Sequence, residues 1–315
     1  MFRSFFSYLA KAGWARNIVA NWSFAWKMAS RFVAGQTLAD GIQVIKSLNE
    51  KGIDATLDHL GENTDSPEKA RRAAADIVQA FDGIEAADVR ANVSIKLTQI
   101  GLGISSELCI ENLKTILEKA RSYNSFVRID MEDSTVTQKT LDVLYAARQL
   151  GYENVGIVIQ AYLYRSQDDL HKLLGDCFKI RLCKGAYTES SHIAYPKMKD
   201  IDANYDRCAE LLIECALAND CPKVSADGKT PPIPGLATHD SKRIDSAKAY
   251  AEKVGLPKDA MEFQMLNGIR KELQEQLVNE GYHVRVYVPY GTEWYPYFMR
   301  RIAERPADLW FLLPR

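Results

Sequence analysis

The sequence lacks several features that would place it in a specialised class. Its six cysteines form no C-x-x-C pair, so we expect neither a structural zinc site nor a disulfide scaffold, and a reducing compartment suits it. Forty basic residues against 41 acidic ones leave a net charge of -1, which gives no electrostatic reason for nucleic-acid binding. Charged residues interrupt the apolar runs before any approaches the roughly 18 residues of a bilayer-spanning helix.

What remains is the profile of a globular protein with a large core. The chain has 315 residues, of which 47% are hydrophobic and 26% charged. No short repeat, low-complexity tract or Pro/Gly-rich linker divides its main part. We therefore predict a helical N-terminal arm over residues 1–51 and one domain over residues 52–315.

The arm has an unusual composition. Five cations and no acid precede Asp40, and they are interspersed with aromatic residues, among them Trp14, Trp22 and Trp26. Such a segment suits an amphipathic arm on an anionic lipid surface. It equally suits helices that pack on the main domain or on a partner subunit, and the composition leaves both interpretations open.

After the arm, short β-rich runs alternate with longer amphipathic stretches. Candidate strands lie at 54–63, 91–101, 125–133, 154–163, 178–187, 233–240, 261–269 and 283–291. Helical patterns include 66–81, 106–123, 137–151, 203–219, 240–255 and 294–305. Eight strand–helix units in about 260 residues predict an α/β fold of the (β/α)8 barrel type. A doubly wound sheet is the alternative, weakened by the lack of a G-x-G-x-x-G loop after the first strand.

Polar residues follow the predicted strands at the same end, which in a barrel is the end that carries function. They are Asp58, His59, Lys96, Asp130, Glu132, Asp133, Gln160, Arg181, Lys184, Tyr187, Thr238, His239, Asp240, Gln264, Tyr287 and Tyr290. His59, Asp58 and Asp130 are types that bind metals, but the nearby cations disfavour a divalent ion, and we expect none.

Two cations near one strand end, Arg181 and Lys184, favour a phosphate or an electron-rich ring, and Gly185 allows a ligand to approach the backbone closely. A lysine at a strand end is also the device of Schiff-base aldolases. Lys184 or Lys96 would serve as the amine nucleophile if burial lowered its pKa. This aldolase reading is the alternative function.

The run "YFMRRIAER", residues 297–305, places Arg300 beside Arg301 on the last predicted helix. Glu304 lies four residues after Arg300, so the two can form an ion pair, either as a solvated surface pair or as part of a site. If the helix faces the barrel mouth, two guanidinium groups can hold a carboxylate. Leu266 and Tyr287 would then offer apolar contact to a small acid with a hydrocarbon body.

The strand ends and the last helix carry the motifs "SIKLTQIG", "RIDMED", "IQAYLYRS", "IRLCKGAY", "LATHD", "FQMLNGI" and "RVYVPYG" followed by "YFMRR". Taken together, these motifs resemble the proline dehydrogenase family, which includes a domain of bacterial proline utilization A. It implies a distorted (β/α)8 barrel that binds FAD noncovalently and oxidises L-proline to Δ1-pyrroline-5-carboxylate. The length of the chain implies the monofunctional bacterial type.

The resemblance also implies roles for individual residues. Lys96, Arg300 and Arg301 would bind the proline carboxylate, and Glu304 would order the arginines. Tyr187, Tyr287 and Leu266 would enclose the ring, while Asp130 would pair with Lys96 and support the site. Residues implied for the flavin are Asp130, Gln160, Arg181, Lys184, Gly185, Ala186, Thr238, His239 and Gln264, with Arg181 near the flavin N5.

Two positions depart from the family pattern. Asp240 stands where Asn is frequent, which puts an adenosine or phosphate contact in question, and Thr188 stands where bifunctional members carry Trp. The resemblance further implies a membrane quinone as electron acceptor. The protein would then be cytoplasmic and peripheral at the inner face of a bacterial membrane, with a mitochondrial location less favoured.

Overall fold

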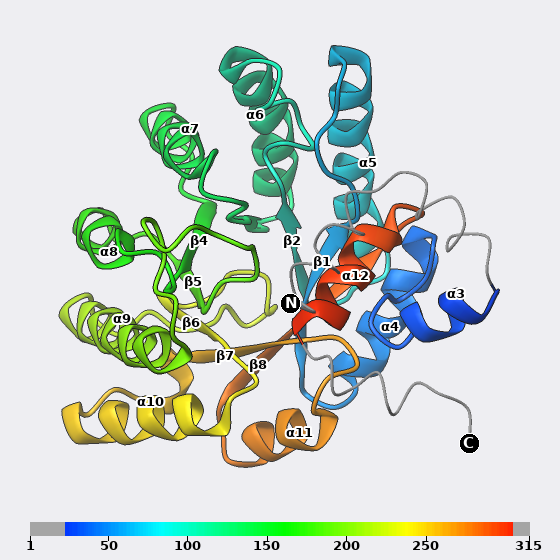
Figure 1. Cartoon of the computed structure of the whole chain (residues 1–315). Coiled ribbons are helices and arrows are strands. Elements are labelled where there is room, and N and C mark those ends of the chain that lie inside the picture. The colour runs from blue at the N-terminus through cyan, green and yellow to red at the C-terminus, as the bar shows by residue number, and fades with distance from the viewer. Residues whose placement is uncertain (1–22, 305–315) are drawn as a thin grey trace.

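The computed structural model describes residues 23–304, with side chains described over 25–302. Eight parallel strands form a closed barrel in the order of the sequence, and helices surround it (Figure 1), which confirms the predicted (β/α)8 fold. The strands are β1 (Asp54–His59), β2 (Ala91–Ile95), β3 (Val127–Ile129), β4 (Val155–Gln160), β5 (Ile180–Cys183), β6 (Pro234–Ala237), β7 (Glu262–Leu266) and β8 (His283–Tyr290).

Helices connect the strands and precede the first one. They are α3 (Ser23–Ala29), α4 (Leu38–Asn49), α5 (Pro67–Ala86), α6 (Ser106–Ser122), α7 (Thr137–Gln149), α8 (Ser166–Gly175), α9 (Met198–Ala218), α10 (Ser241–Val254), the 3-10 turn η1 (Lys258–Ala260), α11 (Lys271–Asn279) and α12 (Trp294–Glu304). Several begin at side-chain caps: the hydroxyls of Ser66 and Ser105 accept backbone N–H groups of α5 and α6, and Asp240 caps α10.

The last helix departs from a regular barrel. In Figure 1, α12 lies over the barrel end near β1 instead of beside β8. The place beside β8 is taken by α4, which packs against both β8 and β1. Residues 38–49, within the predicted arm, therefore complete the outer ring of helices, and α12 is free to cover the strand ends.

A separate small core joins α12 to α3. Trp294 and Phe298 are buried on the face of α12 that packs against Ala25 and Ala29. The rings of Trp26 and Trp294 meet edge to face with centroids 5.4 Å apart. The described part of the arm thus packs on the helix that carries Arg300 and Arg301.

The barrel strands alternate between an apolar outer face and a polar interior. In β2 and β3, Val93, Ile129 and their neighbours join the main core, whereas Asn92, Ser94 and Arg128 are buried polar residues. Gly156 on β4 makes room for the guanidinium of Arg128, because a Cβ there would lie 2.8 Å from Arg128 Nη1. The interior is thus a polar network that leads to the site.

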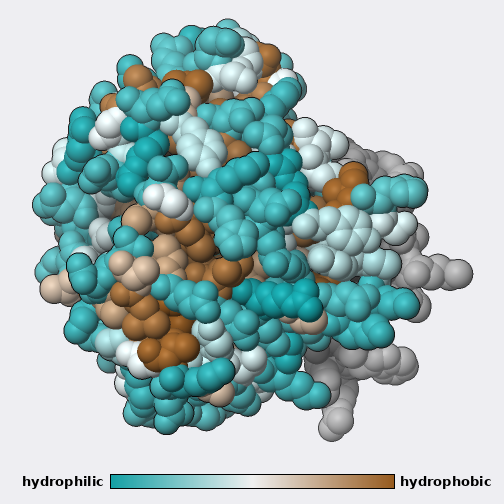
Figure 2. All heavy atoms as spheres, turned by 90° about the vertical axis from the view of Figure 1, so that its left-hand side faces the viewer, coloured by the Kyte–Doolittle hydropathy of each residue, from teal (hydrophilic) through white to brown (hydrophobic). Residues whose placement is uncertain are grey.

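The outer surface is mostly hydrophilic. Figure 2 shows the side on which α7, α8 and α9 lie, with a hydrophobic patch among polar side chains. The described residues that are large, hydrophobic and exposed are Ile104, Leu150, Tyr164, Ile193 and Met198. Within residues 23–304, no helix has the length and apolar character required to cross a membrane.

Candidate active site

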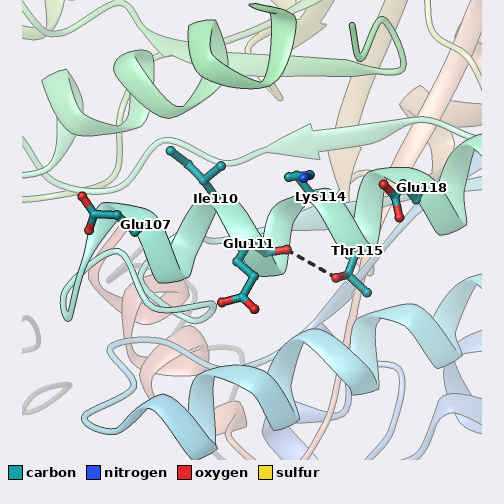
Figure 3. Close-up of a pocket in the computed structure, with 6 residues that line it drawn as sticks. All are labelled: Glu107, Ile110, Glu111, Lys114, Thr115 and Glu118. Atoms are coloured by element: carbon teal, nitrogen blue, oxygen red, sulfur yellow. Dashed lines mark hydrogen bonds between the residues drawn. The ribbon is translucent and has the colours of Figure 1, made fainter. Parts of the chain in front are cut away.

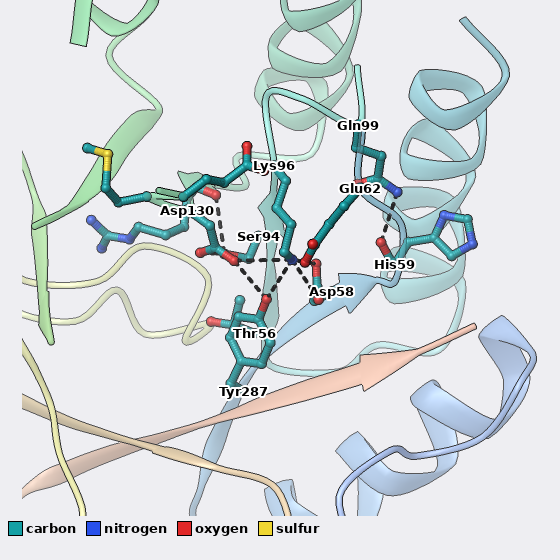
Figure 4. Close-up of polar contacts among 12 residues, drawn as sticks. Thr56, Asp58, His59, Glu62, Ser94, Lys96, Gln99, Asp130 and Tyr287 are labelled. Atoms are coloured by element: carbon teal, nitrogen blue, oxygen red, sulfur yellow. Dashed lines mark hydrogen bonds and ion pairs between the residues drawn. The ribbon is translucent and has the colours of Figure 1, made fainter. Parts of the chain in front are cut away.

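Lys96 is the centre of a buried charge cluster at the carboxyl ends of the strands. Its Nζ atom lies 3.1 Å from each carboxylate oxygen of Asp58 and 3.6 Å from Asp130 Oδ2. It also lies 3.3 Å from the hydroxyl of Tyr287, which itself donates to Asp130 Oδ2 over 2.7 Å. Figure 4 shows these side chains converging from β1, β2, β3 and β8. The contact between Lys96 and Asp130 that we predicted is present.

The surroundings keep Lys96 protonated. Burial alone would lower the pKa of Lys96, but the carboxylates of Asp58 and Asp130 raise it above its usual range. Burial also disfavours the charged form of Asp130, yet Lys96 and Arg181 hold the pKa of Asp130 below its usual value. The pKa of Asp58 is raised, first by burial and then by Asp130, although Lys96 opposes the shift.

Arg181 fixes the other side of Asp130. Its Nη1 donates to Asp130 Oδ1 over 2.9 Å and to Ser94 Oγ over 3.1 Å, while its Nε donates to Gln264 Oε1. The guanidinium lies 5.3 Å from the centroid of the Tyr287 ring. Asp130 therefore holds Arg181 and Tyr287 in fixed positions on either side.

Arg300 lies at the same end of the barrel, where its carboxylate partner among the described residues is Glu62. Its two terminal nitrogens bind the carboxylate of Glu62 at 3.0 and 2.5 Å, a bidentate pair that joins α12 to the loop after β1. The side chain of Glu304, the partner we expected, lies outside the described residues. The Arg300 guanidinium also lies 5.9 Å from the ring centroid of Tyr187.

This pair is electrostatically linked to Lys96. Burial would raise the pKa of Glu62, but Arg300 and then Lys96 hold it below its usual value. The pKa of Arg300 is raised by Glu62 and Tyr187 against the opposing effect of burial. Arg301 lies with its guanidinium 5.1 Å from the ring of Tyr297.

Apart from Asp130, which follows β3, the residues implied for the flavin lie in or after β4 to β7. Lys184 binds Asp202 and Asp240 at 2.5 and 2.7 Å, so the Asp240 departure places a second carboxylate on this lysine. Gly185 has φ of 114°, and a Cβ there would lie 2.3 Å from the Tyr162 ring, so only glycine fits this strand end.

Among the same residues, a hydrogen bond joins the segment after β6 to the end of β7. Leu266 donates its N–H to His239 Nε2 over 2.9 Å, and Asp240 donates its N–H to Thr238 Oγ1 over 3.1 Å. Leu266 is the last residue of β7, half-buried at the site. Tyr287, which we expected at the end of the eighth strand, lies within β8, because that strand continues to Tyr290.

Two residues of the cluster were not assigned to it from the sequence. Asp58 stood among the polar strand ends, and its inward-facing position in β1 is the signal that could have included it. Glu62, in contrast, lies in a loop 238 residues away from Arg300 along the chain. No periodic pattern marks it, so only the placement of α12 reveals the pair.

Elsewhere in the described region, support for a functional site is weaker than at the charge cluster. A shallow pocket on α6 is lined by Glu107, Ile110, Glu111, Lys114, Thr115 and Glu118 (Figure 3). All six belong to one outward face of α6, and none belongs to the charge cluster of Lys96. Within the described residues, no group of three or more His, Cys, Asp or Glu side chains is arranged to hold a metal ion.

Comparison with known proteins agrees with this architecture. The sequence matches the proline dehydrogenase family over residues 41–312. It is 40% identical to "Proline dehydrogenase 2" of Bacillus subtilis over 309 residues, 98% of this chain and 96% of the relative. It is 41% identical to "Proline dehydrogenase" of Deinococcus radiodurans over 292 residues, 91% of this chain and 89% of that one.

A solved structure gives the same fold. Proline utilization A from Bdellovibrio bacteriovorus, inactivated by N-propargylglycine, superimposes with a TM-score of 0.77 at 27% identity over 92% of this chain and 34% of that protein. A closed parallel barrel with cations and carboxylates at its strand ends defines a (β/α)8 enzyme. The chain belongs to the proline dehydrogenase family, oxidoreductases of the first step of proline catabolism.

Proposed function

We propose that this protein oxidises L-proline to Δ1-pyrroline-5-carboxylate with noncovalently bound FAD and passes the electrons to a membrane quinone. The observation that supports it most directly is the pair of cations, Lys96 and Arg300, that act on the same carboxylate, Glu62, at the barrel mouth. Cations so placed suit the carboxylate of a small amino acid.

The carboxylate of proline would lie among Lys96, Arg300 and Arg301. Lys96 is already fixed by Asp58 and Asp130, so it loses little conformational freedom when it binds. Arg300 keeps its bidentate bond to Glu62, which holds α12 over the bound ring. The guanidinium of Arg300 beside Tyr187 then covers the ligand from above.

The ring of proline would lie between Tyr287 and Leu266. Tyr287 is held by its bond to Asp130, so its ring offers a rigid apolar face, and burial raises its pKa, which keeps the phenol neutral. Fixing the carboxylate and the ring together orients C5 of proline.

The residues present fit a flavin. The Oε1 atom of Gln160 is buried and has no hydrogen-bond partner within the described region, so it can accept the N–H of a flat heterocycle. Arg181, held by Asp130 and Gln264, presents a rigid cation at the same end of the barrel. When bound, the flavin would supply the acceptor for the hydride that leaves proline C5.

The aldolase alternative is disfavoured by the state of its lysines. A Schiff-base lysine must be neutral to attack a carbonyl group. The pKa of Lys96 is raised, and Lys184 binds two carboxylates, Asp202 and Asp240. Both lysines are therefore engaged by carboxylates, and neither stands in the apolar surroundings of a Schiff-base lysine.

The absorbance spectrum of the purified protein tests the proposed reaction. We expect a flavin band that bleaches when proline is added without oxygen, together with a product that o-aminobenzaldehyde traps as a coloured adduct. A colourless protein that borohydride and a keto acid inactivate would instead support the aldolase. A flavin band that proline leaves unchanged would contradict the proposal as well.

We further propose a cytoplasmic protein that contacts the inner face of the bacterial membrane through its N-terminal arm. The support is the cationic, aromatic composition of residues 1–22, which lie outside the described region. Deleting residues 1–22 leaves α3 in place, and we expect it to abolish co-sedimentation with anionic liposomes but not the reduction of flavin by proline. Unchanged co-sedimentation would assign the arm to packing or assembly.

A further inference from the structure

Glu132 forms an unusual contact close to the charge cluster of Lys96 and Glu62. It lies two residues beyond Asp130 and is buried, with 5% of its surface exposed. Both of its carboxylate oxygens bind one residue, Thr98: Oε1 accepts the backbone N–H over 3.1 Å and Oε2 accepts the hydroxyl over 2.5 Å. Because both oxygens of a buried carboxylate bind one threonine, we infer that Glu132 fixes the position of Thr98.

Thr98 in turn holds the loop after β1. Its hydroxyl oxygen accepts the N–H of Asn63 over 3.3 Å, and its carbonyl oxygen accepts the N–H and the hydroxyl of Thr64 over 3.2 and 3.1 Å. The residue just before Asn63 is Glu62, which holds Arg300. A continuous chain of contacts therefore runs from Glu132 through Thr98 and the loop to the helix above the substrate.

The direction of the hydrogen bond between the Thr98 hydroxyl and Glu132 depends on whether Glu132 is protonated. An ionised carboxylate only accepts, so the Thr98 hydroxyl points its hydrogen at Glu132 and keeps its lone pairs for Asn63. A protonated acid becomes a donor, so the Thr98 hydroxyl loses Glu132 as its acceptor, and the charge-assisted bond between the two residues is replaced by a weaker neutral one. Ionisation therefore completes the anchor, and protonation loosens it.

The surroundings bring the pKa of Glu132 into the physiological pH range. Burial raises the pKa of Glu132 to about 7, with a further contribution from Glu62, while the bonds from Thr98 and the charge of Lys96 oppose it. The titratable groups that face Glu132 are Glu62 from the loop after β1, Lys96 at the end of β2, Cys109 from α6 and Tyr187 after β5.

These neighbours do not themselves titrate near neutral pH. The pKa of Cys109 is raised to about 12, by burial and then by Glu132. The pKa values of Lys96 and Tyr187 are raised, and that of Glu62 is lowered. A change near neutral pH that depends on this cluster would therefore report on Glu132.

We propose that Glu132 is a positioning residue: its ionised carboxylate anchors Thr98 and the loop of residues 60–66, so that Glu62 holds Arg300 over the substrate and carboxylate binding tightens. The proposal rests on the proposed function, because it assigns the clamp to Arg300. Ionised Glu132 also adds negative charge near an anionic ligand, which acts in the opposite direction. The anchor prevails because it acts through direct contacts, whereas this charge is offset by Lys96.

Binding of cyclopentanecarboxylate to the flavin-loaded protein tests the proposal. This ring carboxylate has no amine to oxidise, so its dissociation constant, measured by calorimetry, reports binding alone. Between about pH 6 and pH 8.5 we expect the Kd of the wild type to fall about fivefold with a midpoint near 7. In Glu132→Gln the amide donates to Thr98 at every pH, so Kd should stay at the weak, low-pH value throughout.

Two further variants separate anchoring from a general effect. Thr98→Val keeps the carboxylate but removes its hydroxyl partner, so binding should weaken and the remaining inflection should move to higher pH. Glu189 binds Ser134 with both carboxylate oxygens: Oε1 accepts the backbone N–H of Ser134 over 2.8 Å, and Oε2 accepts its hydroxyl over 2.6 Å. Glu189 is not bonded to the loop of residues 60–66. Glu189→Gln should keep the inflection near pH 7.

The outcomes are distinct from those that test the function. If proline reduces the flavin of the wild type but Glu132→Gln binds as tightly as the wild type at about pH 8, the anchor is wrong and the function stands. Tighter binding by Glu132→Gln would show that the charge of Glu132 prevails, which also overturns the proposal. If proline fails to reduce the wild-type flavin, the function itself fails.

Discussion

Lys96 is the residue on which the buried charges of the site depend. Asp58 is fully buried, and Lys96 binds both of its oxygens. Asp130 has other partners, Arg181 and Tyr287, and would keep them if the lysine were lost. The lysine thus compensates Asp58 above all.

Lys96→Met should therefore destabilise the protein by about 3–5 kcal/mol, because it leaves a buried carboxylate uncompensated. Adding Asp58→Asn should recover part of this loss, since the amide carries no charge. Urea-induced unfolding of the wild type, the single variant and the double variant measures both effects. A double variant no more stable than Lys96→Met would show that Asp58 does not need the lysine.

Arg300 and Arg301 are the residues that we expect to set the affinity for proline. Replacing either one by Met should raise the KM for proline by the equivalent of roughly 2–4 kcal/mol, because a charge-assisted pair to the carboxylate is lost. Steady-state kinetics measures this change. Arg71→Met removes an exposed arginine from α5, whose partner Glu111 lies at 3.6 Å, and should leave KM unchanged. Unchanged KM in both site variants would refute the clamp.

Among the elements, α12 has the most specific task. Its apolar face follows the spacing of Trp294, Phe298 and Ile302, four residues apart, and this stripe packs on α3 in a core separate from the barrel. The opposite side carries Arg300 to Glu62. Packing on one side and an ion pair on the other therefore set the position of the helix.

Trp26→Ala should loosen α12 without unfolding the barrel, because Trp26 packs only partly buried in this separate core. Hydrogen exchange measured by mass spectrometry should become faster over residues 294–302 and stay unchanged in the strands. Tyr145→Ala removes a comparable edge-to-face contact with Phe178, at 5.8 Å, and should leave exchange in α12 unchanged. Slow exchange in α12 of Trp26→Ala would show that the ion pair alone holds the helix.

The elements differ in how far the sequence predicts them. Short β-rich runs ending in polar residues predicted the barrel strands, and helical spacing predicted a helix around Arg300. The place of α4 beside β8 was not predictable, because it depends on where α12 lies. The same dependence hides Glu62: its pairing with Arg300 is a tertiary contact between a loop and the far end of the chain.

At the scale of the whole molecule, the barrel brings residues from all parts of the chain to one mouth. Asp58 lies in β1, Lys96 and Asp130 directly follow β2 and β3, and Arg300 lies in the last helix. Family membership accounts for this arrangement, and the resemblance seen in the sequence motifs is confirmed by the match over residues 41–312. Of the two departures from the family pattern, Asp240 binds Lys184, a residue implied for the flavin.

The account as a whole rests on where a ring carboxylate binds. A crystal structure of the flavin-loaded protein with cyclopentanecarboxylate is the most direct measurement. The account predicts the carboxylate between Lys96 and the arginines of α12, with the ring against Tyr287 and facing the flavin. A carboxylate bound elsewhere, with Arg300 and Arg301 turned to solvent, would contradict it.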